Sequence, residues 1–298
     1  MTQGKKVTLA APAKINLGLE VLGRRSDGFH DIRTVMAMVN LSDTLTVAIV
    51  GTSAASRVEG VKEENLIARA LAAYRKQRPR SPMLGWSIEK RIPLAAGLGG
   101  ASSDAAAMLR AANHLCPDPL DEHLLYELAA DLGSDVPFFL NGPAAVASGR
   151  GTKLEVIELP RLDLLLVVPR VELRGKTQLL YSLLQSSDFT DGTRIDDLIH
   201  TIRTGRTPSR LMLRNAFGRA LCSHVPRIQQ LQDVLERDLD FPWGLSWAGP
   251  GHYVIAPIGE HDEIRRHLES RFPAWLETSS VTTLHAVPDL SVDTTGSG

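Results

Sequence analysis

Hydrophobic residues alternate with polar or small residues early in the chain. In residues 15–21 every second side chain is apolar, which is the period of a strand with one buried face. Residues 45–49 repeat this alternation, and residues 86–88 predict a further short strand. Elsewhere the apolar residues recur at helical spacing. These predicted helices lie at residues 66–74, 105–115 and 124–132.

The pattern changes after about residue 160. Residues 164–168 predict a short strand that is apolar throughout. Helical spacing follows at residues 179–184, 195–202, 216–221, 228–235 and 264–268, with strands near 253–256 and 281–287. We therefore predict two domains, residues 1–160 and 161–290, followed by a small, polar and disordered tail at 291–298.

This order of elements favours the α+β fold class. Strands lead into one loop–helix element with antiparallel pairs around it, whereas a doubly wound sheet would alternate strands and helices regularly. The chain has 298 residues, 43% of them hydrophobic, which is enough to bury two cores.

Charge and cysteine content exclude several classes of protein. The 33 Lys and Arg residues against 34 Asp and Glu residues leave no general basic field for nucleic acid or an anionic membrane. Cys116 and Cys222 are too few and too far apart for a disulfide scaffold or a zinc site. The apolar run at residues 7–13 is broken by Pro12 and Lys14, so it predicts no signal peptide, and no later run reaches membrane-spanning length. We expect a cytoplasmic protein, monomeric or homodimeric, that acts on a small molecule.

The stretch before the alanine-rich helix carries the clearest chemistry. Residues 93–103 place three glycines and two serines at the mouth of that helix, where backbone N–H groups and the helix dipole can hold an anion. A Walker A loop would need a lysine, and none lies between Lys90 and Asp104; a dinucleotide-binding loop would need a glycine at Ser102. The alternative is a glycine-rich turn that only caps a buried helix.

Two charged residues outside this loop are candidates for catalysis. Lys14 shares the polar face of the first predicted strand with Asn16, although a lysine on a strand is usually only solvated. Asp135 lies in a turn beside Phe138 and Phe139. These rings would shield its carboxylate from water and favour pairing with a cation, whereas the alternative is a carboxylate that only bonds its own turn.

Residues 93–107 resemble the second motif of the GHMP kinases, which include galactokinase, homoserine kinase and mevalonate kinase. The resemblance implies an amino-terminal α+β domain, a ferredoxin-like carboxy-terminal domain and a cleft between them. It also implies ATP accompanied by Mg²⁺, without assigning the metal ligands. The implied ATP-binding residues are Pro93, Leu94, Ala95, Ala96, Gly97, Leu98, Gly99, Gly100, Ala101, Ser102 and Ser103 along the triphosphate, and Asn65 near the adenine.

Residues 11–17 resemble the first motif of one GHMP subfamily, that of the non-mevalonate isoprenoid pathway. The resemblance implies that Asp135 accepts the proton of the attacking hydroxyl. Lys14 would orient that hydroxyl and balance the charge on the transferred phosphoryl group. Asn16 is expected to contact the substrate beside Lys14.

Residues 23–46 resemble the substrate-binding segment of the same subfamily, whose substrate carries a cytidine diphosphate. By themselves, residues 23–32 would be a polar hairpin turn. The resemblance implies that Phe29 and Tyr181 stack on the two faces of the cytosine and that His30 bonds its edge. Two alternatives stay open: a GHMP kinase for homoserine or mevalonate, and a catalytically weak nucleotide-binding protein.

One segment departs from the family pattern. The third GHMP motif is a Ser-Gly-Ser-Gly loop, and its best match here is residues 246–251, with Trp247 at the first glycine and Ala248 at the second serine. Because left-handed backbone is strained for an indole-bearing residue, we predict an ordinary non-glycine conformation at Trp247. We also predict that the indole borders the cleft without filling the phosphate site.

Overall fold

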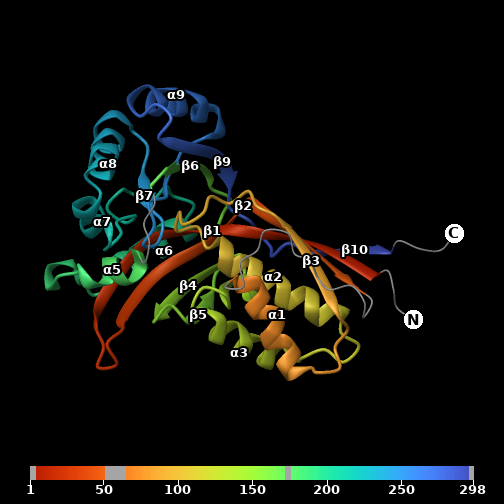
Figure 1. Ribbon diagram of the computed structural model, residues 1–298. Coiled ribbons are helices and arrows are strands. Elements are labelled where there is room, and N and C mark those ends of the chain that lie inside the picture. Colours follow the sequence, from red (N-terminus) through yellow and green to blue (C-terminus); the bar gives the residue numbers. More distant parts are fainter. Residues whose placement is uncertain (1–4, 51–64, 172–175, 295–298) are drawn as a thin grey trace.

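Two antiparallel sheets form the framework of the protein. The computed structural model describes residues 5–50, 65–171 and 176–294. The larger sheet has the order β10-β1-β2-β4-β5, and β3 pairs with the carboxyl-terminal end of β2. Figure 1 shows β1 and β2 as a long hairpin that crosses the molecule. The strands of this sheet are β1 (Lys5–Arg24), β2 (His30–Ile49), β3 (Leu84–Glu89), β4 (Ala144–Gly149), β5 (Lys153–Val156) and β10 (Leu290–Thr294).

Helices cover one face of the larger sheet. The central helix, α2, packs against β1 and β2, and α1 and α3 pack against α2 (Figure 1). The alanines of α2 from Ala105 onward are buried, and their small side chains let the helix approach the strands closely. Asp121 begins α3 by accepting a hydrogen bond from the Leu124 N–H at 2.8 Å, and the helix ends at Gly133. The helices here are α1 (Leu66–Gln77), α2 (Gly100–Leu115), α3 (Glu122–Leu132) and the short α4 (Phe138–Asn141).

The smaller sheet has the order β7-β8-β6-β9. The fully apolar run of β6 is explained by burial on both faces. Leu164 and Leu166 pack against Ile15 and Leu17 of β1, whereas Leu165 and Val167 lie in the cluster formed with α8 and α9. The elements of this half are β6 (Asp163–Pro169), α5 (Lys176–Ser182), η1 (Ser186–Asp188), α6 (Thr193–Arg203), α7 (Gly218–His224), α8 (Pro226–Asp238), β7 (Trp243–Leu245), β8 (His252–Ile255), η2 (Ile258–Glu260), α9 (His261–Arg271) and β9 (Leu276–Thr282).

This architecture confirms the α+β fold class, because both sheets are antiparallel and the helices are packed against them. The predicted domain boundary near residue 160 falls between β5 and β6, which belong to different sheets. How the chain divides into domains stays a prediction.

Two predictions at the carboxyl end of the chain were wrong. The disordered tail expected at 291–298 is instead a strand as far as residue 294: β10 pairs antiparallel with β1, and Leu290 packs on the core beside it. Residues 295–298 lie outside the described part of the chain. The strand expected near 281–287 runs earlier, over β9, because the chain leaves the smaller sheet after Thr282. The Leu284 N–H then donates to Met38 O at 2.9 Å and brings the chain back to the larger sheet.

Candidate active site

The middle of β1 places a lysine inside the molecule. Since successive strand side chains point to opposite faces, Ile15 packs on the smaller sheet while Lys14 and Asn16 face the other way. Lys14 is fully buried, and its Nζ donates to Asn16 Oδ1 at 2.5 Å. Asn16 Nδ2 in turn donates to Thr34 Oγ1 at 3.0 Å, and that hydroxyl donates to Gly18 O at 2.6 Å. The ammonium is therefore held in one position.

Asp135 is the acidic partner of this lysine. It lies in the turn between α3 and α4, with its side chain 15% exposed, and its Oδ2 is 3.6 Å from Lys14 Nζ. Burial lowers the pKa of Lys14, and the Asp135 carboxylate opposes that shift. The structure thus brings together the two residues predicted to act as a pair. It places a nearly buried carboxylate where it can accept a proton.

The glycine-rich loop lies directly against this pair. The Lys14 N–H donates to Leu98 O at 2.9 Å. Left-handed φ angles alternate along the loop, with 55° at Ala95, 85° at Gly97 and 72° at Gly99. Such alternation forms a nest, in which successive N–H groups converge on an anion. Gly99 then begins α2 without a side-chain cap, so the first turn offers its own N–H groups to the same anion.

Gly99 has a packing role that its sequence context did not indicate. The sequence suggested that these glycines admit the phosphates closely. A Cβ at Gly99 would instead lie 2.9 Å from both Lys14 Cγ and Phe139 Cζ. The missing side chain therefore leaves room for the Lys14 side chain, and a substitution here would displace Lys14.

The loop that follows β7 clamps the glycine-rich loop from outside. The Gly251 N–H donates to Ala96 O at 2.9 Å, and Ser246 Oγ donates to Gly97 O at 3.0 Å. A Cβ at Gly249 would stand 2.3 Å from Ala96 O, closer than any real contact. This explains why Gly249 is kept where the neighbouring positions depart from the third motif.

A group of charged residues that the sequence analysis missed fixes the entry to the glycine-rich loop. Lys90 pairs with the buried Asp43 and, at 2.6 Å, with Asp104 of α2. Asp43 Oδ1 also accepts the N–H groups of Arg91 and Ile92, at 2.6 and 2.9 Å. Burial raises the pKa of Asp104 to about 7. The sequence feature that could have indicated this group is the placement of Lys90 before the glycine-rich loop and of Asp104 after it.

Asn65 lies at the start of α1. Its Oδ1 accepts a hydrogen bond from the Ile67 N–H at 2.9 Å, which caps the helix. This contact accounts for the side chain in structural terms, and the predicted position near the adenine stays a prediction.

An aromatic cavity of about 940 Å³ opens beside the Lys14–Asp135 pair. The predicted substrate residues Phe29, His30 and Tyr181 all line it. The ring stacked on Tyr181 is that of His30, with centroids 4.9 Å apart and planes at 24°, and the contacts of these three residues with a cytosine stay a prediction. Phe29 is half exposed, and the Arg150 guanidinium lies 3.5 Å from its ring centroid. The lining of the aromatic cavity also includes Ser134, Arg150, Phe189 and Trp247.

The imidazole of His30 suits recognition by hydrogen bonds. Burial, with a smaller contribution from Arg24, lowers its pKa. The ring is therefore neutral near pH 7 and carries one donor and one acceptor nitrogen. Arg150 and Phe189 were not predicted from the sequence. Arg150 approaches Phe29, and Phe189 approaches His30, only through the tertiary fold.

Comparison with known proteins identifies the family. Residues 65–143 match the family model of the GHMP kinases N terminal domain. The 4-diphosphocytidyl-2-C-methyl-D-erythritol kinase of Dehalococcoides mccartyi strain BAV1 is 34% identical over 254 residues, which are 84% of this chain and 89% of the relative. An enzyme of the same name from Thermus thermophilus is 39% identical over 199 residues, 66% of this chain and 70% of the relative. This chain belongs to the 4-diphosphocytidyl-2-C-methyl-D-erythritol kinase family of GHMP kinases.

Solved structures agree with membership of this GHMP kinase family. A crystal structure of 4-(cytidine 5'-diphospho)-2C-methyl-D-erythritol kinase superimposes with a TM-score of 0.79 at 31% identity, covering 93% of this chain and 98% of the other. Homoserine kinase from Cytophaga hutchinsonii gives a TM-score of 0.73 at 14% identity, a likeness of fold alone. Within the described residues, no helix has the length and apolar character needed to cross a membrane.

The departure from the GHMP third motif has a structural consequence at Trp247. The prediction of an ordinary backbone conformation there was wrong, since Trp247 has a φ of 50° in the left-handed region. Asn215 Nδ2 holds this backbone by donating to Leu245 O at 2.9 Å and to Trp247 O at 3.0 Å. The indole lines the aromatic cavity, and its centroid lies 4.9 Å from Lys14 Nζ. It therefore forms a cation–π contact with the buried ammonium.

We expect Trp247→Gly to change kcat/KM by no more than about tenfold, or ~1.4 kcal/mol. The variant loses a cation–π contact of about 0.5–2 kcal/mol, and it relieves left-handed strain of about 1–3 kcal/mol. Steady-state kinetics would measure the change, with Trp247→Phe as the matched variant that keeps a ring. A wild-type protein that is inactive until Trp247 is replaced would contradict this expectation.

Proposed function

We propose that this protein transfers the terminal phosphoryl group of ATP to the 2-hydroxyl of 4-diphosphocytidyl-2-C-methyl-D-erythritol, giving the 2-phosphate and ADP. The reaction belongs to the non-mevalonate route to isopentenyl diphosphate. The Lys14–Asp135 pair carries the proposal, because it adjoins both an anion-binding loop and an aromatic cavity of a size that suits a nucleotide. The proposal includes a cytoplasmic location and a monomeric or homodimeric state.

In this mechanism Asp135 accepts the proton of the attacking hydroxyl. Its position in a short turn, with Oδ2 3.6 Å from the buried Lys14 ammonium, keeps the carboxylate oriented. Lys14, held by Asn16, orients the hydroxyl and balances the negative charge that develops on the transferred phosphoryl group. Burial strengthens both effects, because little water screens these charges.

ATP would lie along the glycine-rich loop, with its phosphates on the N–H groups of the nest and of the first turn of α2. Mg²⁺ would accompany it and neutralise charge on the phosphates. In the described residues no group of three His, Cys, Asp or Glu side chains could hold a metal ion alone. Ser103 Oγ, which is buried and without a partner among the described residues, fits a single protein oxygen for an ion held mainly by phosphates.

A coupled assay of ADP release tests the proposed function. We expect ATP turnover to require the cytidine substrate, with no turnover when homoserine or mevalonate replaces it. Turnover with either of those alcohols would support a different GHMP kinase. Nucleotide binding without turnover on any of the three would support the weak binding protein, for which Trp247 is the one favouring feature.

We expect Tyr181→Ala to raise the KM for the cytidine substrate by about 5- to 150-fold, because a base–aromatic stack contributes about 1–3 kcal/mol. The KM for ATP should stay unchanged. Phe29→Ala should have a similar effect if both rings contact the base. Tyr181→Phe, which keeps the ring, is the matched control and should behave like the wild type. A crystal soak with CDP that places the base outside this cavity would contradict the assignment.

A further inference from the structure

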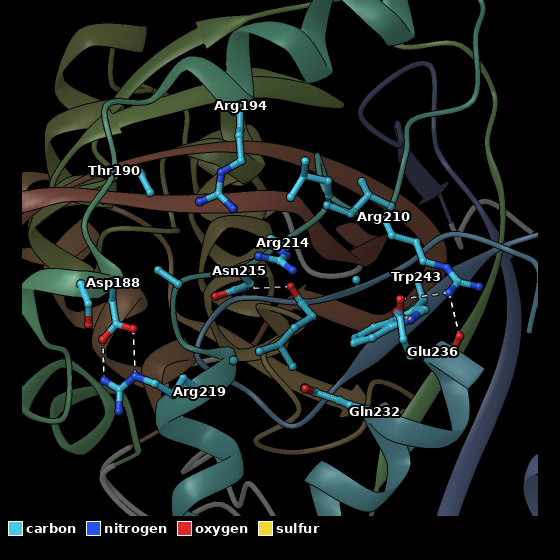
Figure 2. Close-up of a pocket in the computed structure, with 17 residues that line it drawn as sticks. Asp188, Thr190, Arg194, Arg210, Arg214, Asn215, Arg219, Gln232, Glu236 and Trp243 are labelled. Atoms are coloured by element: carbon cyan, nitrogen blue, oxygen red, sulfur yellow. Dashed lines mark hydrogen bonds and ion pairs between the residues drawn. The ribbon is translucent and has the colours of Figure 1, made fainter. Parts of the chain in front are cut away.

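A second cavity, of about 630 Å³, lies in the half of the molecule that holds the smaller sheet. It is walled by the start of α6, the segment 210–219, α8 and β7 (Figure 2). No residue that lines it also lines the aromatic cavity, and the glycine-rich loop contributes nothing to it. The kinase reaction proposed above therefore makes no use of this space. Its volume falls in the range of small-molecule sites, roughly 300–1,000 Å³.

Arginines dominate the lining of this cavity. Four guanidinium groups face two carboxylates, in a chain whose net charge is only −1. The four are Arg194, Arg210, Arg214 and Arg219, and the carboxylates are Asp188 and Glu236. Because Glu20, which is not part of the lining, pairs with Arg194, only the Arg214 guanidinium is left without a carboxylate partner among the described residues.

Three of these arginines already have a carboxylate partner, and two of the partners line the cavity. Arg219 binds Asp188 in a two-pronged contact, with Nε at 2.9 Å from Oδ1 and Nη2 at 2.5 Å from Oδ2. Arg210 lies 3.2 Å from the Glu236 carboxylate. Figure 2 shows these pairs at opposite sides of the cavity. These two ion pairs form part of the wall of the cavity.

Arg194, which is the third paired arginine, and Arg214 keep free donors. Arg194 directs its Nε to the buried Glu20, at 3.1 Å, and its two Nη groups have no acceptor among the described residues. The Arg214 side chain has neither an ion pair nor a hydrogen bond within that same part of the chain, and Figure 2 shows it in the middle of the cavity. A guanidinium group presents donors in a fork that matches the oxygens of a phosphate.

Thr190 adds an independent observation. Its Oγ1 is buried, it has no hydrogen-bond partner in the described structure, and the residue lines the same cavity. A ligand oxygen could reach this hydroxyl only after the Thr190 side chain rotates about χ1, and it would then satisfy a donor that otherwise has no partner. Apolar surface from Leu213, Leu245 and the Trp243 ring completes the wall. The lining therefore combines free cationic donors, one free hydroxyl and an apolar side.

We propose that this cavity is a second ligand site, which binds a small molecule carrying a phosphate or diphosphate group. Arg194 and Arg214 would hold the anion and Thr190 would donate to one of its oxygens. The apolar wall would contact the body of the ligand. Arg214 is the residue to test, since Asn215 beside it also fixes Trp247 and would affect the active site.

Isothermal titration of the full chain with inorganic diphosphate tests the proposal. The active site is first saturated with a non-hydrolysable ATP analogue and CDP, so that any further binding occurs elsewhere. We expect one remaining site in the wild type and at least a tenfold weaker Kd in Arg214→Ala. Arg203→Ala, which removes an exposed arginine from the far end of α6, is the matched control and should keep the wild-type Kd.

Three outcomes would overturn the proposal. The first is that the saturated wild type binds no diphosphate. The second is that Arg214→Ala binds diphosphate as tightly as the wild type does. The third is that Arg203→Ala loses as much affinity as Arg214→Ala. Wild-type kcat and KM in Arg214→Ala would show that the variant is folded, so a lost site is not mistaken for a lost fold. The identity of the kinase substrate enters only through the CDP that fills the active site. A wild type that does not bind CDP would therefore contradict the proposed function, and the comparison of Arg214→Ala with Arg203→Ala would still test the second site.

Discussion

Asp135→Asn is expected to lower kcat at least about a hundredfold, the lower end for loss of a general base. Asparagine keeps the shape of the side chain but cannot accept the proton of the attacking hydroxyl. It also removes the carboxylate that lies 3.6 Å from the buried Lys14 ammonium. The affinity for ATP should change little, because the proposed contacts of the glycine-rich loop with the phosphates are made by its backbone N–H groups. Steady-state kinetics and an ATP titration measure the two effects separately.

Asp131→Asn is the matched control for this variant. Asp131 lies one turn before Asp135 at the end of α3, and it is exposed. Its replacement should leave kcat unchanged, whereas a general effect of charge near the site would appear in both variants. A near-normal kcat in Asp135→Asn, with a melting temperature close to that of the wild type, would exclude Asp135 as the base.

The sequence predicted those features that depend on local periodicity. The alternation in residues 15–21 and the apolar spacing in 105–115 correspond to β1 and α2, because each pattern is imposed by the element itself. The strand predicted near 281–287 was misplaced because no clear local periodicity marks the strand that forms there. β9 carries polar residues such as Ser279 and Ser280, so its alternation is weak, and its position is set by pairing with β6.

The candidate site likewise contains residues that local motifs predict and contacts that only the tertiary fold creates. Lys14, Asp135 and the glycine-rich loop stand in recognisable motifs, and the structure brings them together. The stacking of His30 on Tyr181 joins residues far apart in the chain, and the contact of Arg150 with Phe29 does the same. No local pattern encodes such contacts. The left-handed backbone of Trp247 is likewise imposed by Asn215 from another segment.

The second large effect is expected for Lys14→Met, which should lower kcat by about 10²–10³-fold, the range for removing one preorganised electrostatic donor. Methionine fills the space between Gly99 and Phe139, where a bulkier residue would clash. Removing one partner of a buried ion pair leaves the other charge uncompensated and usually destabilises the protein, so the melting temperature should fall, although the Asp135 side chain is 15% exposed and water relieves part of this cost. The kcat is therefore measured at a temperature at which circular dichroism shows the variant to be folded. A variant in which only the KM for ATP changes would show that Lys14 binds nucleotide and does not take part in the transfer.

Combining Lys14→Met with Asp135→Asn decides whether the two residues act as one unit. If Lys14 works by holding and balancing the charge around the proton transfer to Asp135, removing both should cost about as much as removing the more damaging one alone. Independent roles would instead multiply the two losses, giving a kcat at least about 10⁴-fold below the wild type. The 3.6 Å contact between Nζ and Oδ2, in a site with little water, favours the first result, since each residue orients the other and the Asp135 carboxylate opposes the lowering of the Lys14 pKa by burial.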